Sequence, residues 1–211
     1  MEPPYDAVAA SQTLAAVDPH LGDVIARVGP PRLTLRPDET LPALLRSIVY
    51  QQLSTKAAAT IHGRVLTAFG DGEVLDLDAL APAPDEDLRA CGLSRAKTAA
   101  VRDLVARQRA GTLPSRADLL GMADEDVVAA LTAVRGVGPW TAQMVLIFNL
   151  GRPDVWPVAD LGVQEGVRIV QGLEARPTAR EMVALGEPYA PWRSVAAWYG
   201  WRALHAARGE E

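Results

Sequence analysis

The chain has a single cysteine, Cys91, among its 211 residues. One cysteine cannot form an intramolecular disulfide, and it cannot supply the ligands of an iron–sulfur cluster or a cysteine-based zinc site. No Lys or Arg precedes Arg27, although a signal peptide would require positive charge near its start. No uninterrupted apolar run approaches the ~20 residues of a membrane span. These absences predict a protein of a reducing compartment, cytoplasmic and without a membrane partner.

Basic residues are fewer than acidic ones, with 21 Lys and Arg against 26 Asp and Glu. The formal net charge of −5 argues by itself against a nucleic-acid partner. Its distribution is uneven, however, because residues 71–88 hold seven acids and no Lys or Arg, whereas residues 89–116 hold seven bases and one acid, Asp103. On charge alone, this pattern is typical of two solvated helix faces of opposite sign.

Alternating β-branched stretches are nearly absent, while helix-period patterns with start and stop signals recur, so the sequence predicts an all-α fold. Pro- and Gly-rich breaks near residues 29–40 and 151–157 predict where the chain crosses between two helical subdomains. We expect one subdomain of residues 40–155 and a second of residues 1–39 with 156–211. Helices are expected at 6–17, 21–28, 41–52, 54–69, 85–92, 95–110, 125–133, 141–149 and 161–170, with Thr40, Ser94 and Asp124 among the caps.

Residues 131–142, LTAVRGVGPWTA, indicate a helix, a tight hairpin and a second helix, within a motif of about residues 124–149. Gly136 and Gly138 give the turn free φ angles, and Pro139 suits a first helical position. Such a turn directs backbone N–H groups at a ligand, which suits a phosphate of a DNA backbone without sequence preference. A Gly-x-Gly pair alone more often marks an ordinary helix–helix turn.

Asp160 follows this motif by a distance that the chain can retrace. The helix 141–149 rises ~1.5 Å per residue, and the loop 150–159 is long enough to return over it, so we expect Asp160 near Trp140. Asp160 also precedes the helical pattern 161–170, where its carboxylate would cap the helix and be held ionised by the helix dipole. Taken alone, a purely structural cap is the commoner role for such an aspartate.

Four ordered segments resemble one family. Residues 134–142, VRGVGPWTA, and 156–160, WPVAD, resemble the helix-hairpin-helix DNA glycosylase superfamily with its Gly-Val-Gly turn and catalytic aspartate. Residues 47–58, SIVYQQLSTKAA, and 191–194, PWRS, are similar to its 3-methyladenine DNA glycosylase II type, which excises alkylated bases. The resemblance covers about residues 41–205 and implies two helical subdomains flanking a substrate cleft. The ~40 residues before it are too few for the N-terminal β-rich domain of many such relatives.

The resemblance implies a role for Asp160. Hydrolysis of an N-glycosidic bond builds positive charge on the sugar, which an ionised Asp160 would stabilise while orienting or deprotonating the attacking water. Bifunctional members carry a lysine where this chain has Trp140, so the resemblance implies a monofunctional enzyme that leaves the strand intact. The alternatives are a non-catalytic DNA-binding module and a bifunctional glycosylase/lyase for oxidised bases.

The resemblance also implies the residues that contact the substrate. A cationic alkylated base favours an electron-rich aromatic pocket, for which Trp140 and Trp192 are candidates, with Tyr50 and Trp156 as weaker ones. Met144 and Leu161 stand where some relatives have tyrosines. The base must flip out of the duplex, and Leu53 matches the intercalating wedge that fills the gap. Predicted DNA contacts are Gln51, Gln52, Leu53, Gly136, Val137, Gly138, Thr141 and Arg193, with Lys97 as a further phosphate contact.

No cofactor is required for this chemistry. In the family, the hairpin often binds a monovalent cation, Na+ or K+, through backbone carbonyls, which here would be those of Thr132, Val134 and Val137. The implied partner is double-stranded DNA containing alkylated bases, and we expect the protein to act as a monomer.

Overall fold

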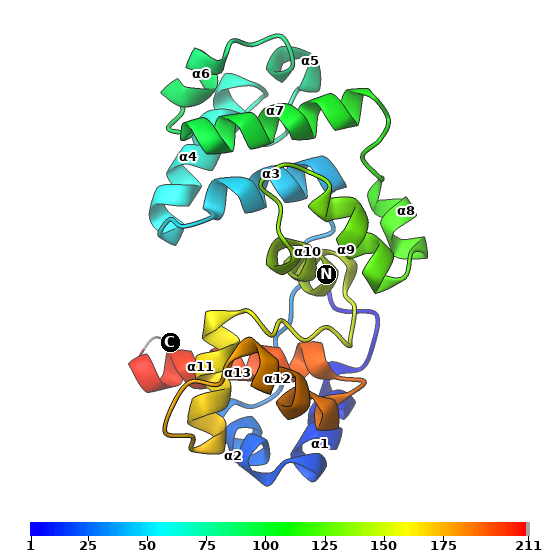
Figure 1. The fold of residues 1–211 in the computed structure, drawn as a ribbon, viewed down its shortest axis with the longest axis vertical. Helices are drawn as coiled ribbons and strands as arrows, with labels where there is room; N and C mark the ends of the chain where they lie inside the picture. Colours follow the sequence, from blue (N-terminus) through cyan, green and yellow to red (C-terminus); the bar gives the residue numbers. More distant parts are fainter. Residues whose placement is uncertain (210–211) are drawn as a thin grey trace. The chain divides into compact units, whose positions relative to one another are not determined.

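The computed structural model describes residues 1–209, apart from the side chain of residue 55. The regular elements of these residues are helices, with an isolated antiparallel bridge between Gly70 and Leu75 (Figure 1). The predicted all-α fold is therefore confirmed. None of the helices in the described part of the chain combines the length and the hydropathy that a bilayer span requires.

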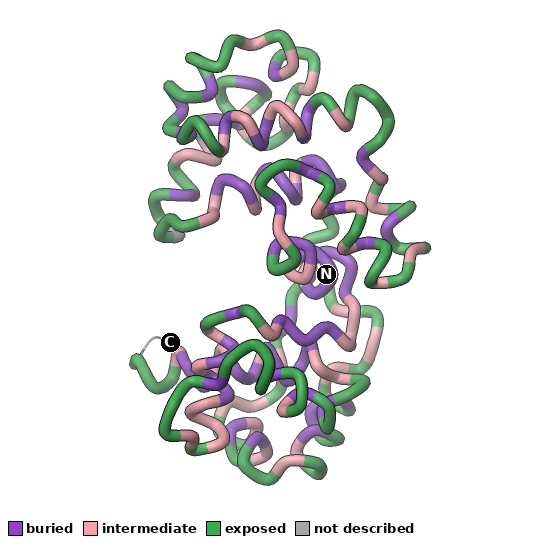
Figure 2. Tube along the Cα trace, viewed as in Figure 1, coloured by how far each residue is buried: buried purple, intermediate pink, exposed green. Residues whose placement is uncertain are grey.

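The chain divides into two compact units. Residues 38–145 form the first, which we call the hairpin unit. Residues 1–37 and the chain from Leu146 onward form the second, which we call the carboxylate unit. In each unit the buried residues line the inner faces of the helices, and the exposed residues lie on the outer turns and loops (Figure 2).

The hairpin unit is organised around two helices, α3 and α7, that pack against each other. Leu44 and Ile48 on α3 are fully buried, as are Val101 and Leu104 on α7. In chain order its helices are α3 (Thr40–Tyr50), α4 (Thr55–Ala68), α5 (Leu77–Leu80), α6 (Asp85–Ala90), α7 (Arg95–Arg109), α8 (Arg116–Gly121), α9 (Asp124–Thr132) and α10 (Pro139–Val145).

Helix starts in this unit follow the predicted caps at some positions and differ at others. Ser94 Oγ accepts the amide of Lys97 at 3.3 Å and begins α7 as expected. Thr40 and Asp124 are instead the first residues of α3 and α9, after Glu39 and Ala123, which form no side-chain cap. Three acids in the first turn of α9 favour its start, because negative charge there complements the helix dipole.

The carboxylate unit packs α11 along α13 at short range. A Cβ added to Gly166 on α11 would lie 2.1 Å from the carbonyl oxygen of Gly200 on α13, so only glycine allows this approach. In chain order its elements are α1 (Ala7–Val17), α2 (Pro19–Val28), the π-helix η1 (Leu146–Leu150), α11 (Leu161–Gln171), α12 (Ala179–Gly186), the 3-10 helix η2 (Glu187–Tyr189) and α13 (Arg193–Arg208).

The boundary between the units differs from the sequence prediction. Residues 146–155 were expected with the hairpin motif, but the chain divides between Val145 and Leu146. Hydrogen bonds tie this segment to the carboxylate unit, since Phe148 O accepts the amide of Arg36 at 2.8 Å and Asn149 Nδ2 donates to Arg36 O at 2.7 Å. The expected helix 141–149 accordingly ends as an α-helix at Val145 and continues as the π-helix η1.

Candidate functional site

The hairpin between α9 and α10 is a tight turn closed by its own backbone. Val134 O accepts the amide of Val137 at 3.1 Å, and Gly138 O accepts the amide of Ala142 at 3.1 Å. Gly136 has φ +78°, a left-handed angle that favours glycine. Gly138 does not use this freedom, but a Cβ there would meet nothing within 4 Å, so the space beside it is open to a ligand.

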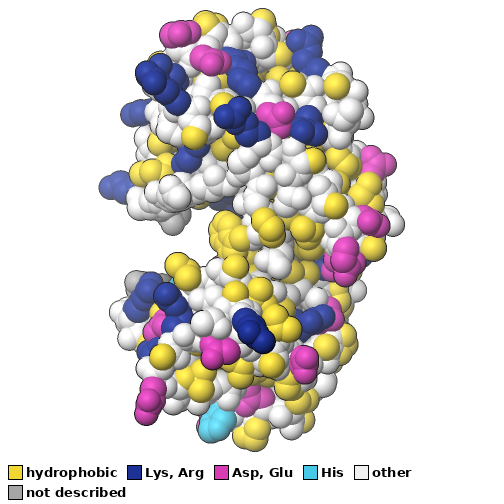
Figure 3. Space-filling model, viewed as in Figure 1, with side chains coloured by type: hydrophobic (Ala, Val, Ile, Leu, Met, Phe, Trp, Pro, Cys, Tyr) yellow, Lys and Arg dark blue, Asp and Glu magenta, His cyan; other side chains and the backbone are white. Residues whose placement is uncertain are grey.

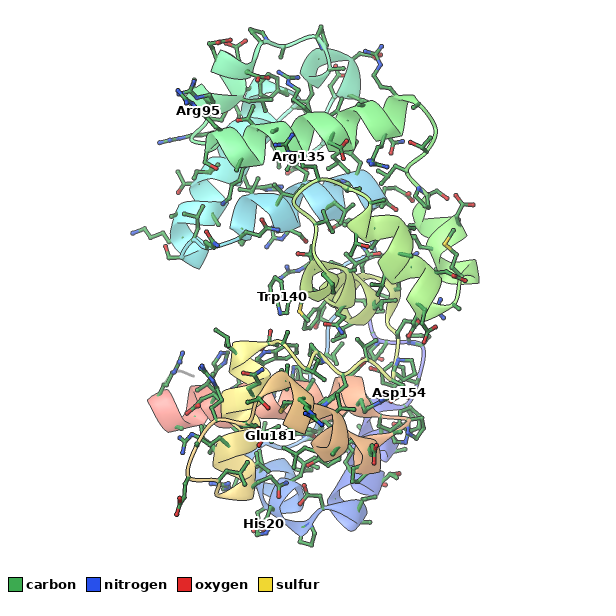
Figure 4. All side chains as sticks on the ribbon, in the orientation of Figure 1. His20, Arg95, Arg135, Trp140, Asp154 and Glu181 are labelled. Carbon is green, nitrogen blue, oxygen red and sulfur yellow. The ribbon has the colours of Figure 1, made fainter. Side chains whose placement is uncertain are left out.

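The hairpin rests on α7. A Cβ added to Gly136 would lie 3.1 Å from the Cβ of Ala100, and Asp103 Oδ2 accepts the backbone amide of Arg135 at 2.8 Å. Desolvation by burial alone would raise the pKa of Asp103, but the hydrogen bonds from Arg135 and Arg107 outweigh it and lower that pKa. Arg135 itself is exposed at the turn (Figure 4).

The joint of residues 51–54, between α3 and α4, lies beside the hairpin. Gln51 Nε2 donates to Gly136 O at 3.0 Å and lies 3.5 Å from Oγ1 of the buried Thr141. Gln52 has φ +55°, a left-handed angle that is rare for a residue with a side chain. Leu53 is 40% exposed.

The aromatic candidates of this unit occupy different environments. Trp140, the second residue of α10, is 42% exposed (Figure 4), and Met144 one turn later is half-buried. Tyr50 has the guanidinium of Arg46 over its ring at 4.4 Å and the ring of His62 at 6.2 Å, edge to face. The ring of Tyr50 therefore already contacts one side chain of α3 and one of α4.

The predicted positive run on α7 pairs in part with neighbouring acids. Arg102 Nε donates to Asp85 Oδ1 at 2.8 Å, and Arg107 Nε donates to Asp103 Oδ2 at 2.9 Å. On the face drawn in Figure 3, further Lys and Arg side chains lie over the hairpin unit around α4 and α7. This surface keeps positive charge although the whole chain is acidic.

In the carboxylate unit, Asp160 is the N-cap of α11, as predicted. The residue is 7% exposed, and Oδ1 accepts the amide of Val163 at 2.7 Å. Oδ1 also accepts the indole N–H of Trp201 at 3.0 Å. Gly162 makes room for this contact, because a Cβ there would lie 2.9 Å from Trp201 Cδ1. The carboxylate is thus buried and oriented from two sides.

Trp201 was not predicted from the sequence as a partner of Asp160. It lies on α13, 41 residues after Asp160, and no local motif connects the two positions. Trp201 also packs against Phe148, with ring centroids 5.6 Å apart. Only the packing of α11 against α13 brings the indole to the carboxylate.

The remaining predicted residues of this unit have defined surroundings. Leu161 is 61% exposed directly after Asp160. Trp192 is half-buried and packs against Tyr5, with ring centroids 5.7 Å apart. Trp156 is a core residue, whose Nε1 donates to Met182 O at 2.7 Å.

Arg193 forms a bidentate ion pair with Asp154, which is labelled in Figure 4. Its Nε donates to Asp154 Oδ1 at 2.6 Å and its second guanidinium nitrogen donates to Oδ2 at 2.7 Å. These hydrogen bonds lower the pKa of Asp154. A phosphate contact by Arg193 would therefore have to compete with this pair.

Side-chain metal ligands do not gather in the described part of the chain, where no group of three His, Cys, Asp or Glu residues could hold an ion. The hairpin carbonyls remain the candidate donors for a monovalent cation. Val134 is buried, and its carbonyl oxygen accepts one amide bond within the turn. Because a carbonyl oxygen has two lone pairs, this bond still permits coordination of a cation.

Comparisons with known proteins find a matching family and matching folds. Residues 45–191 match the family model of the HhH-GPD superfamily base excision DNA repair protein. The chain is 31% identical over 172 residues to DNA-3-methyladenine glycosylase 1 of Schizosaccharomyces pombe, covering 82% of this chain and 75% of that protein. The solved structure of the Schizosaccharomyces pombe 3-methyladenine DNA glycosylase with abasic DNA matches with a TM-score of 0.84 at 30% identity, covering 92% of this chain and 95% of that one. The DNA-3-methyladenine glycosidase of Bacillus halodurans matches with a TM-score of 0.83 at 34% identity, covering 95% and 91%.

Proposed function

Since the chain belongs to the HhH-GPD superfamily of base excision DNA repair proteins, we propose that it is a monofunctional DNA glycosylase for alkylated purines in double-stranded DNA. The observation that carries this proposal is Asp160, a buried carboxylate oriented by the amide of Val163 and the indole of Trp201. Relatives that share about a third of their residues with this chain are named for 3-methyladenine, which supports the lesion class.

The proposed chemistry uses the negative charge of Asp160. As the bond between sugar and base breaks, positive charge develops on the deoxyribose, and a fixed carboxylate stabilises it without having to reorganise. The same carboxylate orients or deprotonates the water that attacks the sugar. An alkylated purine already carries positive charge, so the base leaves with little need for a second, acidic carboxyl.

Water is the proposed nucleophile because Trp140 occupies the position just after the hairpin where a lyase would need an amine. An indole cannot form a Schiff base with the sugar. We therefore infer that the product is an abasic site in an uncut strand, and that borohydride traps no covalent complex with DNA.

DNA binding is proposed at the hairpin and the joint of the hairpin unit. The amides around Gly136, Val137, Gly138 and Thr141 suit a backbone phosphate, since the space beside Gly138 is open. Gln51, Gln52 and Leu53 are the proposed contacts of the joint, with the exposed Leu53 as the wedge that fills the gap left by the flipped base. Arg193 is also proposed as a DNA phosphate contact, which it can form only by leaving Asp154.

The base pocket is proposed to use aromatic faces for a cationic base. Trp140 and Trp192 are the main candidates, since neither is fully buried and cation–π contact contributes about 0.5–2 kcal/mol. Met144, Leu161 and Tyr50 are the other proposed lining residues. Na+ or K+ on the carbonyls of Thr132, Val134 and Val137 would add positive charge beside the proposed phosphate site, and the protein is proposed to act as a monomer.

The test is the release of bases by an Asp160→Asn variant. Asparagine keeps an oxygen that can accept both hydrogen bonds and is itself a good N-cap, so the fold should survive while the charge is lost. Duplex DNA methylated with dimethyl sulfate is incubated with each protein, and released 3-methyladenine and 7-methylguanine are measured by chromatography. We expect wild type to release alkylated purines and Asp160→Asn to lose at least about a hundredfold in rate.

Asp6→Asn is the matched control. Asp6 caps α1 in the same unit through Oδ1, which accepts the amides of Val8 and Ala9, yet it has no proposed role in catalysis. Its variant should match wild type. Equal release by wild type and Asp160→Asn would refute the role of Asp160, and salt-dependent binding without release from any alkylated duplex would indicate a DNA-binding protein without catalysis.

A further inference from the structure

One face of α7 contacts both of the loops that are proposed to bind DNA. Lys97, Ala100 and Asp103 follow one another at intervals of three residues, so they lie along the same side of the helix. Ala100 and Asp103 contact the hairpin, as described above. Lys97 contacts the joint.

Lys97 caps the end of α3 with its side chain. Its Nζ donates to the carbonyl oxygens of Val49 at 2.8 Å and Gln51 at 2.7 Å. The last carbonyls of a helix have no partner within the helix, and a cation there also complements the helix dipole. Burial lowers the pKa of Lys97, which is consistent with an ammonium group drawn into the protein.

Gln51 completes a closed circuit of contacts. Its carbonyl oxygen accepts from Lys97, while its side-chain amide donates to Gly136 O at 3.0 Å in the hairpin. The hairpin in turn is bound to Asp103 on α7. The joint is therefore fixed to α7 directly and to the hairpin laterally.

Gln52, with its left-handed backbone angle, lies directly after a residue of this circuit. A non-glycine residue in the left-handed region costs free energy and persists only where its surroundings determine it. Gln52 directly follows the carbonyl that Lys97 binds, and directly precedes the exposed Leu53. The strain lies in the segment that is proposed to enter the base stack.

We propose that Lys97 is a positioning residue and that α7 holds the joint at a fixed spacing from the hairpin, so that the wedge enters the base stack next to the phosphate that the hairpin grips. This inference rests on the proposed function. It differs from the phosphate contact that the sequence suggested for Lys97, because the ammonium group here binds protein carbonyls. Loss of Lys97 should impair insertion of the wedge and leave the attraction to DNA phosphates unchanged.

The test compares three variants. Lys97→Met removes every donor and keeps a long unbranched side chain. Lys97→Arg keeps a donor group that can reach carbonyl oxygens. Arg109→Met removes one positive charge from the exposed opposite end of α7 and serves as the control for charge.

Three readouts separate the roles. Insertion of the wedge is followed by the fluorescence of 2-aminopurine placed beside a tetrahydrofuran abasic analogue in a duplex, which needs no base release. Affinity for an undamaged duplex is measured against salt concentration. The rate of base release from dimethyl sulfate-treated DNA is measured under single-turnover conditions, with thermal unfolding recorded for each protein.

For Lys97→Met we expect a weaker 2-aminopurine signal and a release rate lower by about tenfold, the loss typical of a charge-assisted hydrogen bond. The slope of log affinity against log salt concentration should be the same for Lys97→Met as for Arg109→Met. Lys97→Arg should recover part of the 2-aminopurine signal. If Lys97→Met unfolds at the assay temperature, Lys97→Gln, which keeps a single donor group, is measured instead.

Two results would overturn the inference. A salt slope lower by about one unit than that of Arg109→Met would make Lys97 a phosphate contact. An unchanged 2-aminopurine signal in a folded Lys97→Met protein would show that the joint needs no such positioning. Failure of the proposed function is distinguishable, because wild type would then release no base from methylated DNA whatever the behaviour of the Lys97 variants.

Discussion

Replacing Trp201 with phenylalanine removes the indole N–H that donates to Asp160 Oδ1 at 3.0 Å, while an aromatic ring remains to pack against Phe148. A hydrogen bond to a charged group contributes about 1.5–3 kcal/mol, and each 1.4 kcal/mol corresponds to about a tenfold change in rate. Because Val163 still donates to the same oxygen at 2.7 Å, the carboxylate keeps one of its two constraints. We therefore expect the lower end of this range, about a tenfold fall in kcat.

The assay is single-turnover release of alkylated purines at saturating enzyme, with binding to an abasic-analogue duplex measured separately. Trp198→Phe is the matched control, because Trp198 lies on the same helix and packs against Tyr199 with ring centroids 4.9 Å apart. Trp198→Phe should keep its rate, and Trp201→Phe should keep its affinity. The reasoning fails if Trp201→Phe releases bases as fast as wild type, or if both substitutions slow release equally.

Two further predictions concern stability. Gly166→Ala places a Cβ 2.1 Å from Gly200 O and should destabilise the fold by about 1–3 kcal/mol or more, which lowers Tm by about 2–4 °C per kcal/mol, whereas Gly121→Ala meets nothing within 4 Å. Equal Tm values for these two variants would contradict the close packing of α11 on α13. Asp154→Asn should lower Tm at neutral pH, because the hydrogen bonds from Arg193 lower the pKa of Asp154 in the folded protein. A lowered pKa in the folded state means that the ionised carboxylate stabilises the fold at pH values above the ordinary aspartate pKa of about 3.9. This stabilisation is lost as the pH falls through the folded-state pKa, so the Tm difference between wild type and Asp154→Asn should close in acid. A difference that persists there would assign the effect to packing.

Local signals in the sequence located the parts of the site that depend on neighbouring residues. Asp160 caps α11 through Val163, three residues away, and Ser94 caps α7 through Lys97 in the same way. Pro139 begins α10, and Gly136 takes the left-handed angle of the hairpin. These features follow from hydrogen bonds and steric limits within one helical turn, which a short stretch of residues specifies by itself.

Local signals were also misleading where several residues could serve. Thr40 and Asp124 suit a cap, yet the helices begin at these residues and not after them. Gly138 does not need the freedom of a glycine for its own backbone angle. The Pro- and Gly-rich break predicts a boundary near residue 155, whereas the compact units divide between Val145 and Leu146, where Phe148 and Asn149 bind Arg36 from more than a hundred residues earlier in the chain.

The sequence by itself determined the helical character of the chain, its hairpin and the aspartate at the start of α11. Only the tertiary structure decided what orients that aspartate and what holds the joint, since Trp201 is 41 residues from Asp160 and Lys97 is 46 residues from Gln51. Both contacts arise where two helices pack, and α11 reaches α13 closely because Gly166 has no side chain. Such contacts depend on the three-dimensional positions of the helices, so no spacing along the chain encodes them.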